Sequence, residues 1–225
     1  MDPNSGEEIL GAERPRSGTN IRASEIKRRD FLYIATSAVA TAGLALAAWP
    51  FIDQMEPGAN ELAAGGPLSV ELSKVAAGQQ ILVRWQSHPV FVVHRTPQIL
   101  ATLKNKSLLS ALRDPDSNEP QQPPYAKNWC RSIKAEYLVL VGICTHLGCI
   151  PTYSPKPGEL GPSWLGGYLC HCHGSRYDLA GRVFRGVPAP LNLPVPPYRF
   201  SGATTLEIGA NPKDQSFSLS SVEQL

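Results

Sequence analysis

Apolar and polar residues follow different patterns along this chain of 225 residues. Residues 1–30 are polar and show no sustained hydrophobic period, which predicts a leader segment. Residues 31–52 form 22 consecutive positions without a charge, and a helix of that length spans about 33 Å, enough to cross a bilayer core. Residues 53–66 contain glycine and proline at intervals, as is typical of a linker. From residue 67 to 225, short apolar runs alternate with turn residues, which favours an all-β head.

The head is expected to contain short strands, because its apolar runs are rich in β-branched or aromatic residues and are bounded by Gly, Pro, Ser or Asn. The expected strands are 68–72, 81–85, 90–94, 137–143, 182–184, 198–200, 204–208 and 216–219. Residues 201–203 are expected to turn a hairpin. The main helix candidate is 96–113, where leucines recur on a rough helical face. Proline (21) and glycine (19) are abundant, which suits a loop-rich β protein better than a helical bundle.

Positive charges precede the apolar stretch, and negative charges follow it. The basic residues are Arg22, Lys27, Arg28 and Arg29, and the acidic residues are Asp53, Glu56 and Glu61. The positive-inside rule therefore predicts a single-pass anchor with a cytoplasmic N-terminus and an external head. In addition, residues 27–32, Lys-Arg-Arg-Asp-Phe-Leu, resemble a twin-arginine export signal, which belongs to a system that carries proteins already folded.

Other classes of protein agree less well with the sequence. A cleaved signal peptide is the main alternative to an anchor, but its apolar core usually has only about 7–15 residues. A buried helix of a soluble domain would normally show a polar stripe. The formal net charge of +2 argues against a nucleic-acid binder that relies on phosphate contacts. A hydrophobic content of 42% excludes a disordered chain.

Two short loops of the head gather residues that bind transition metals. Residues 144–149 read Cys-Thr-His-Leu-Gly-Cys, and residues 170–175 read Cys-His-Cys-His-Gly-Ser. Thiolates and imidazoles are ligands for zinc, copper or iron–sulfur centres, and neither loop offers a carboxylate for a hard cation. No acidic residue in these loops completes a hydrolase triad with Ser175 and its neighbouring histidines. The loops therefore predict a metal centre.

The residue types alone leave two metal centres open. Two cysteines and two histidines can hold one tetrahedral zinc ion. They can also hold a [2Fe-2S] cluster, with both cysteines on one iron and both histidines on the other. Each loop has one cysteine more than either ligand set needs. In an oxidising compartment the two spare thiols can form a disulfide between the loops, which a plain structural zinc site does not need.

The two loops, in this order and behind a membrane anchor, resemble the bacterial Rieske iron–sulfur subunits of the cytochrome bc complex (ubiquinol–cytochrome c reductase). The resemblance includes the later run Gly-Val-Pro-Ala-Pro over residues 186–190. It implies a Rieske-type antiparallel β-sandwich head with a cluster-binding subdomain over residues 144–177. The one departure inside the motif is His171, where the family usually has proline. We interpret His171 as a bystander beside the cluster.

The resemblance also implies roles for individual residues. One [2Fe-2S] cluster per chain is expected, with Cys144 and Cys170 on one iron and His146 and His173 on the other. His173 would face the quinol with His146 beside it, and a disulfide would join Cys149 to Cys172. The hydroxyls of Ser175 and Tyr177 would raise the potential through hydrogen bonds to sulfur. The expected docking rim comprises Leu147, Gly148, Pro188 and Pro190. Apart from the resemblance, the remaining thiol, Cys130, is expected to be buried and unreactive.

By the same resemblance, the chain is the electron-transfer subunit of a respiratory translocase in the bacterial inner membrane. Its periplasmic head would take one electron and one proton from ubiquinol and pass the electron to the haem of a membrane-bound cytochrome c. Cytochrome b would be the second partner, and the whole complex would be a dimer. Residues 53–66 would act as a hinge between the anchor and the head. The alternatives are a Rieske subunit of another exported enzyme such as arsenite oxidase, a soluble Rieske ferredoxin, and a zinc-stapled binding module without redox activity.

Overall fold

The computed structural model describes residues 28–55 and 65–224, and the chain divides into two compact units at residues 57 and 58. We describe each unit by itself. Most of the predicted leader (1–30) and most of the predicted hinge (53–66) lie outside the described residues, so these two assignments stay predictions. The charged residues Arg22, Lys27, Glu56 and Glu61, which flank the apolar stretch, also lie outside the described residues.

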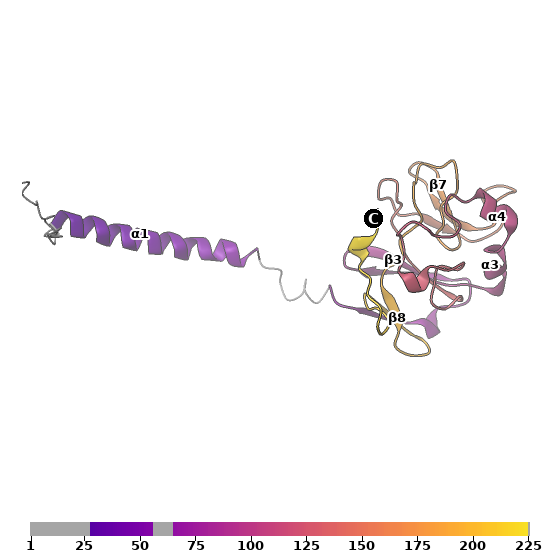
Figure 1. The fold of residues 1–225 in the computed structure, drawn as a ribbon, viewed down its shortest axis with the longest axis horizontal. Helices are drawn as coiled ribbons and strands as arrows, with labels where there is room; N and C mark the ends of the chain where they lie inside the picture. Colours follow the sequence, from indigo (N-terminus) through magenta and orange to yellow (C-terminus); the bar gives the residue numbers. More distant parts are fainter. Residues whose placement is uncertain (1–27, 56–64, 225) are drawn as a thin grey trace, which may run out of the picture. The chain divides into compact units, whose positions relative to one another are not determined.

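The first unit contains one long helix, α1 (Arg28–Asp53), which includes the whole apolar stretch predicted from the sequence (Figure 1). None of its residues is buried by other parts of the described chain. The hydroxyls of Thr36, Ser37 and Thr41 donate hydrogen bonds to carbonyl oxygens one turn earlier, at 2.6 to 2.8 Å. These bonds satisfy polar groups within the helix, as a hydrocarbon environment requires. Among the described residues, α1 is the helix long and apolar enough to cross a membrane.

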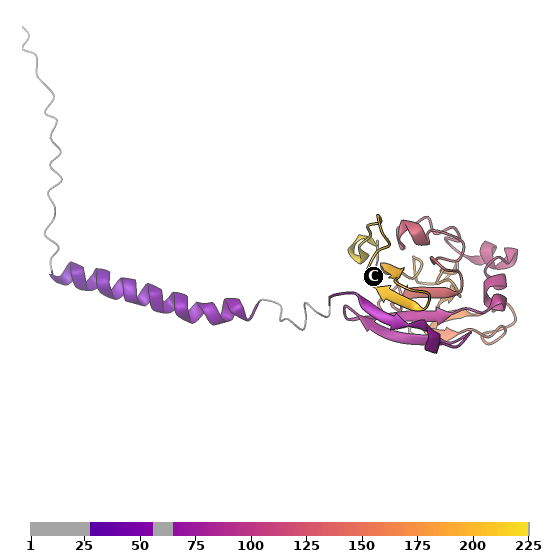
Figure 2. The same ribbon diagram turned by 90° about the horizontal axis from the view of Figure 1, so that it is seen from below.

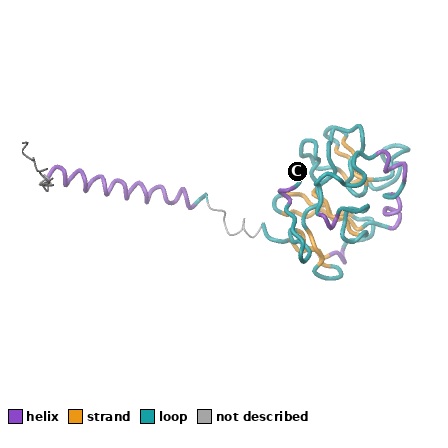
Figure 3. The backbone as a smooth tube through the Cα atoms, viewed as in Figure 1, coloured by secondary structure: helices purple, strands orange, loops and turns teal. Residues whose placement is uncertain are grey.

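The described part of the head contains three antiparallel sheets of three strands each. Their strands, in spatial order, are β1 (Leu68–Glu71), β9 (Thr205–Ile208) and β8 (Tyr198–Phe200); β2 (Gln80–Trp85), β3 (His88–His94) and β4 (Tyr137–Val141); and β5 (Thr152–Ser154), β6 (Gly167–Cys170) and β7 (Ser175–Asp178). In Figure 1, β3 of the second sheet lies between β7 and β8. Long loops connect the short strands, as Figure 3 shows.

One hydrophobic core joins the three sheets, with buried residues from every one of these strands except β5. The rings of Phe91 on β3 and Tyr168 on β6 stack with their centroids 5.5 Å apart. Gly142, directly after β4, lies so close to the ring of Phe91 that a Cβ atom would collide with it. This packing fixes the third sheet, which carries one of the predicted metal-binding loops, against the rest of the head.

The single helix predicted over residues 96–113 is wrong, because two short helices occupy this segment. They are α3 (Pro97–Thr102) and α4 (Lys106–Ala111), which lie side by side at one end of the head in Figures 1 and 2. The side chain of Thr96 accepts a hydrogen bond from the N–H of Ile99, and that of Asn105 accepts one from the N–H of Ser107. The first helix ends at Thr102, and Asn105 has the extended backbone of a capping residue and starts the second.

The expected strands agree with the structure in most places. Those at 68–72, 81–85, 90–94, 198–200 and 204–208 are confirmed within two residues, as is the hairpin turn, and the strand expected over 137–143 ends at Val141. Two expected strands are wrong. Residues 182–184 form only single bridges with two different partners, and residues 216–219 lead into a short 3-10 helix, η3 (Leu219–Ser221). Two more such turns are η1 (Leu72–Lys74) and η2 (Pro124–Ala126).

A buried ionic network holds the turn that follows β7. The carboxylate of Asp178 accepts hydrogen bonds from the backbone N–H of Ala180 at 2.9 Å and of Arg182 at 2.8 Å, and lies 2.7 Å from the guanidinium of Arg182. Arg131 is fully buried and donates to the carbonyl oxygens of Ala180 and Leu193. Burial lowers the pKa of Arg131 to about 9, which leaves it charged at neutral pH. The network therefore ties this turn to the segment around residue 193.

Candidate metal centre

The two predicted metal-binding loops are built on the same backbone turn. Residues 144–149 follow β4, and residues 170–175 connect β6 to β7. The N–H of Gly148 donates to the carbonyl oxygen of Cys144, and the N–H of Gly174 donates to that of Cys170, both at 2.9 Å. Both glycines have a positive φ, +81° and +77°, a region in which a side chain causes strain. The Gly positions of the two motifs therefore allow each loop to turn back directly after its metal-binding residues.

The thiols of Cys144 and Cys170 form a buried pair. Each residue is at most 2% exposed, and the Cys144 thiol is close enough to affect the pKa of the Cys170 thiol. Burial raises the pKa of the Cys170 thiol, and the contact with Cys144 raises it further. The backbone N–H groups of Cys172 and His173 act in the opposite direction and lower this pKa. These two N–H groups are therefore placed to stabilise a negative sulfur ligand.

The rings of His146 and His173 form a second pair, nearer the surface. Their centroids are 4.8 Å apart, and their planes are almost perpendicular at 87°. His146 is half-buried and His173 is exposed. The structure thus places the four residues predicted as ligands in two pairs of like chemistry, a buried pair of thiols and a pair of imidazole rings nearer the surface.

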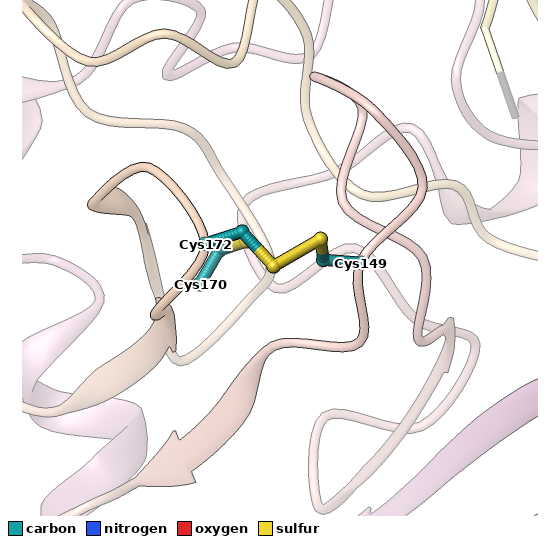
Figure 4. A group of neighbouring side chains, drawn as sticks. All are labelled: Cys149, Cys170 and Cys172. Carbon is teal, nitrogen blue, oxygen red and sulfur yellow. A yellow bond between two sulfur atoms is a disulfide. The ribbon is translucent and has the colours of Figure 1, made fainter.

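A disulfide joins Cys149 to Cys172 and connects the two loops (Figure 4). This is the pairing that the resemblance implied. The sulfur of Cys170 lies within 4.8 Å of both disulfide sulfurs, so these three cysteines form a compact group. Because Cys149 and Cys172 are bonded to each other, the group does not supply three metal ligands.

The hydroxyl of Tyr177 faces the sulfur of Cys144 at 3.2 Å. It accepts a hydrogen bond from the backbone N–H of Thr145, also at 3.2 Å. The hydroxyl of Thr145 donates to the carbonyl oxygen of Leu191 at 2.7 Å, so it is not available as a donor to Tyr177. Burial raises the pKa of Tyr177, which keeps the hydroxyl protonated. Tyr177 is therefore a hydrogen-bond donor held beside a proposed ligand sulfur, and Thr145, which the sequence analysis missed, helps to orient it.

Ser175 is completely buried at the end of the second loop. Its Oγ accepts a hydrogen bond from the backbone N–H of Ala189 at 3.0 Å, which leaves its own proton available for another acceptor. The same contact connects the second loop to the Pro-Ala-Pro segment of residues 188–190. Ser175 thus fits the predicted role of a donor near the centre.

Most residues of the predicted docking rim are exposed. Leu147 is 70% exposed, Gly148 and Pro188 are exposed, and Pro190 is half-buried. Ile150, which is 57% exposed, was not predicted as part of this rim, although it directly follows Cys149.

Two residues singled out in the sequence lie outside the pairs described above. His171 is exposed, as a bystander would be. Cys130 is buried, as predicted, and its sulfur lies 3.0 Å from the side-chain oxygen of Asn128.

Comparisons with known proteins agree with this geometry. A family model described as "Ubiquitinol-cytochrome C reductase Fe-S subunit TAT signal" matches residues 19–58, and one described as "Rieske [2Fe-2S] domain" matches residues 126–197. The ubiquinol-cytochrome c reductase iron-sulfur subunit of Allochromatium vinosum is 50% identical over 184 residues, which cover 81% of this chain and 88% of the relative. The chain belongs to this family. The subunits of Rhodospirillum rubrum (48% identical; 82% of this chain and 93% of the relative) and Blastochloris viridis (46%; 83% and 95%) are also similar.

The structure provides a donor set that fits the cofactor of these iron–sulfur subunits. A Rieske-type [2Fe-2S] cluster takes two thiolates on one iron and two imidazoles on the other. The buried thiol pair and the pair of rings match this division. The family match confirms the predicted cofactor and the predicted Rieske-type β head. Together with α1, the match to the TAT signal fits a membrane-anchored, exported subunit.

Proposed function

We propose that this iron–sulfur subunit accepts one electron and one proton from ubiquinol and passes the electron to the haem of a membrane-bound cytochrome c. The observation that carries the proposal is the division of the donors into buried thiols and surface imidazole rings. When bound, the [2Fe-2S] cluster supplies a one-electron acceptor that two neutral histidine ligands make less negative than an all-thiolate cluster. The second quinol electron is proposed to go to a haem of cytochrome b.

Cys144 and Cys170 are the proposed ligands of one iron, and His146 and His173 those of the other. The contacts around the sulfur atoms support this assignment. The Tyr177 hydroxyl faces the sulfur of Cys144, and the backbone N–H groups of Cys172 and His173 lower the pKa of the Cys170 thiol. Hydrogen bonds to ligand sulfur stabilise the more negative, reduced state, so they raise the potential.

His173 is proposed to meet the quinol. Its side chain is exposed, whereas the neighbouring His146 is half-buried. An imidazole at the surface can accept a hydrogen bond from a quinol hydroxyl and then hold the proton on the ring nitrogen that is not bound to metal. Leu147, Gly148, Pro188 and Pro190 are proposed to form an apolar rim that docks on the partner and excludes water from the proton transfer.

The head is proposed to lie in the periplasm of a bacterium, with the N-terminus in the cytoplasm. Arg28 and Arg29 at the start of α1 and Asp53 at its end support this orientation. Cytochrome b and a membrane-bound cytochrome c are the proposed partners, in a dimeric complex. Residues 53–66 are proposed to be the hinge that lets the head move between them.

The EPR spectrum and midpoint potential of the purified full chain, measured across pH, test this function. The protein is expected to be coloured, with an EPR signal in the reduced state and a potential that falls as pH rises, because reduction takes up a proton. His173→Ala is expected to abolish the EPR signal, whereas the control His171→Ala keeps it with an unchanged potential. A colourless protein that contains zinc, or equal loss in both variants, would contradict the proposal.

A further inference from the structure

A basic pocket of about 510 Å³ lies on the head between α4, the loop that precedes β6 and the segment that follows β7. Two arginines line it, Arg176 on β7 and Arg185, together with the hydroxyl-bearing residues Ser107 and Ser163. None of the described residues that line the pocket is acidic. Small-molecule sites have volumes of about 300–1,000 Å³, so this pocket is large enough for a small ligand.

The pocket is separate from the metal centre. Arg176 lies between Ser175 and Tyr177 on β7, and side chains of a strand point alternately to its two faces. Ser175 and Tyr177 are buried, whereas Arg176 is exposed. None of the proposed iron ligands lines the pocket. A ligand bound there therefore does not occupy the proposed position of the quinol.

Neither arginine of the pocket has an acidic partner. Arg176 and Arg185 form no ion pair within residues 28–55 and 65–224. The Nε of Arg185 donates to the carbonyl oxygen of Leu112 at 2.8 Å, which fixes this guanidinium and leaves its terminal nitrogens available. The guanidinium of Arg176 lies over the ring of Phe184, 5.8 Å from the centroid. Two positive charges without counter-charges therefore favour an anion in the pocket.

Two aromatic rings form an apolar wall beside these charges. The rings of Trp164 and Phe184 are stacked, with centroids 6.0 Å apart. The indole N–H of Trp164 donates to the carbonyl oxygen of Ser154 at 3.1 Å, and the backbone N–H of Phe184 donates to the carbonyl oxygen of Arg176 at 3.1 Å. These bonds hold the wall in place, so it needs no ligand to form.

We propose that this pocket binds a phosphate monoester, either a soluble one or the headgroup of a lipid. A phosphate monoester carries a charge of about −1.5 to −2 and three acceptor oxygens, so it can neutralise both arginines, whereas one carboxylate neutralises only one. The planar guanidinium groups match phosphate oxygens in pairs of hydrogen bonds. The hydroxyls of Ser107 and Ser163 supply further donors, and the wall of Trp164 and Phe184 contacts the organic part of the ligand.

Calorimetric titration of the full chain with inorganic phosphate, in an uncharged detergent, tests this inference. The wild type is expected to bind phosphate. Arg176→Gln and Arg185→Gln are each expected to bind it at least about tenfold more weakly, because each loses charge-assisted hydrogen bonds. Ser163→Ala keeps both charges, removes one exposed hydroxyl and is expected to bind about fivefold more weakly.

Arg84→Gln is the matched control. Arg84 is also an exposed arginine, but it lies on β2 in another sheet and does not line the pocket. This variant is expected to bind phosphate as the wild type does. Near-UV circular dichroism is expected to give the same spectrum for all variants, because each replaced side chain is exposed.

Competition identifies the source of the phosphate group. Displacement of phosphate by dihexanoyl phosphatidic acid, but not by dihexanoyl phosphatidylcholine, supports a lipid headgroup, and displacement by glycerol 3-phosphate alone supports a soluble ester. Absence of binding to the wild type, unchanged affinity in all three pocket variants, or an equal loss in Arg84→Gln would overturn the inference. A penta-aspartate peptide that displaces phosphate at lower concentration than either ester would also overturn it, in favour of an acidic protein segment.

Discussion

The Tyr177 side chain connects the hydrophobic core to the metal centre. Its ring is fully buried in the core, and its hydroxyl reaches the sulfur of Cys144. The backbone N–H of Thr145 fixes the oxygen of that hydroxyl, which directs its proton away from the N–H group. Since burial raises its pKa, the hydroxyl remains a donor throughout the neutral range.

Removing this hydroxyl is expected to lower the midpoint potential. A hydrogen bond worth about 1 kcal/mol more in the reduced state corresponds to roughly 40–50 mV for one electron. Tyr177→Phe is therefore expected to lower the potential by on the order of 50 mV and to slow quinol oxidation, as measured by voltammetry and steady-state turnover. Ser175→Ala is expected to act in the same direction, because Ser175 also has a proton to donate.

Tyr125→Phe is the matched control for Tyr177→Phe. Its hydroxyl bonds to Asn211 and to the N–H of Tyr198, away from the metal-binding loops, and burial raises its pKa to about 12. This variant is expected to lose some stability but to keep the potential of the wild type. Equal potentials in all three variants would remove the tuning role from Tyr177 and Ser175.

The proposed ligands could be predicted from sequence because each loop carries its chemistry within six consecutive positions. The supporting contacts could not be predicted in this way. The hydroxyl of Thr145 bonds to the carbonyl oxygen of Leu191, and that of Ser175 bonds to the N–H of Ala189. Both partners belong to a later segment of the chain. Such partners become visible only when the fold brings distant segments together.

At the scale of elements, the sheet of β5, β6 and β7 is missed by the sequence patterns, which predict none of its three strands. Gly166 and Gly167 look like a turn, yet Gly167 begins β6. The backbone of Tyr177 on β7 approaches Gly167 so closely that a Cβ atom would collide with it. A glycine can therefore mark close strand packing as well as a turn, and local propensity cannot separate the two cases.

The buried ion pair behind β7 is expected to matter far more for stability than an ion pair at the surface. Asp178→Asn leaves the buried guanidinium of Arg182 without a counter-charge, which costs about 3–5 kcal/mol in comparable sites. The expected result is a clear fall in the free energy of unfolding, measured by urea denaturation of the full chain in detergent.

Glu207→Gln provides the comparison for that measurement. The pair of Arg199 and Glu207 also links a carboxylate to an arginine across 2.6 Å, but it is partly exposed to solvent. Its loss is expected to cost much less than the loss of the buried pair, because solvent screens an exposed ion pair. If both variants lose the same amount, the buried network does not stabilise the head in the way described.

At the scale of the whole molecule, the chain combines an apolar helix with a β head that has its own core. Positive charge at the start of α1 is sufficient for orientation by the positive-inside rule. A twin-arginine export signal requires more than positive charge, because it depends on the arginine side chains themselves at Arg28 and Arg29.

Replacement of both residues by lysine separates these two requirements, since R28K and R29K together keep the charge. The head of the double variant is expected to stay inside the cell, whereas the head of the wild type is digested by protease added to spheroplasts. Arg22→Lys, outside the pair, is expected to behave as the wild type. Normal protease sensitivity of the double variant would show that the pair acts only through its charge.

The donors around the buried thiols are held in place by contacts within the protein. Thr145 fixes the Tyr177 hydroxyl, Ala189 fixes Ser175, and the N–H groups at the sulfur of Cys170 belong to a closed turn. Dipoles that are already oriented need not rotate when charge arrives. A change of charge at the buried thiols is therefore expected to need little rearrangement of the surrounding protein.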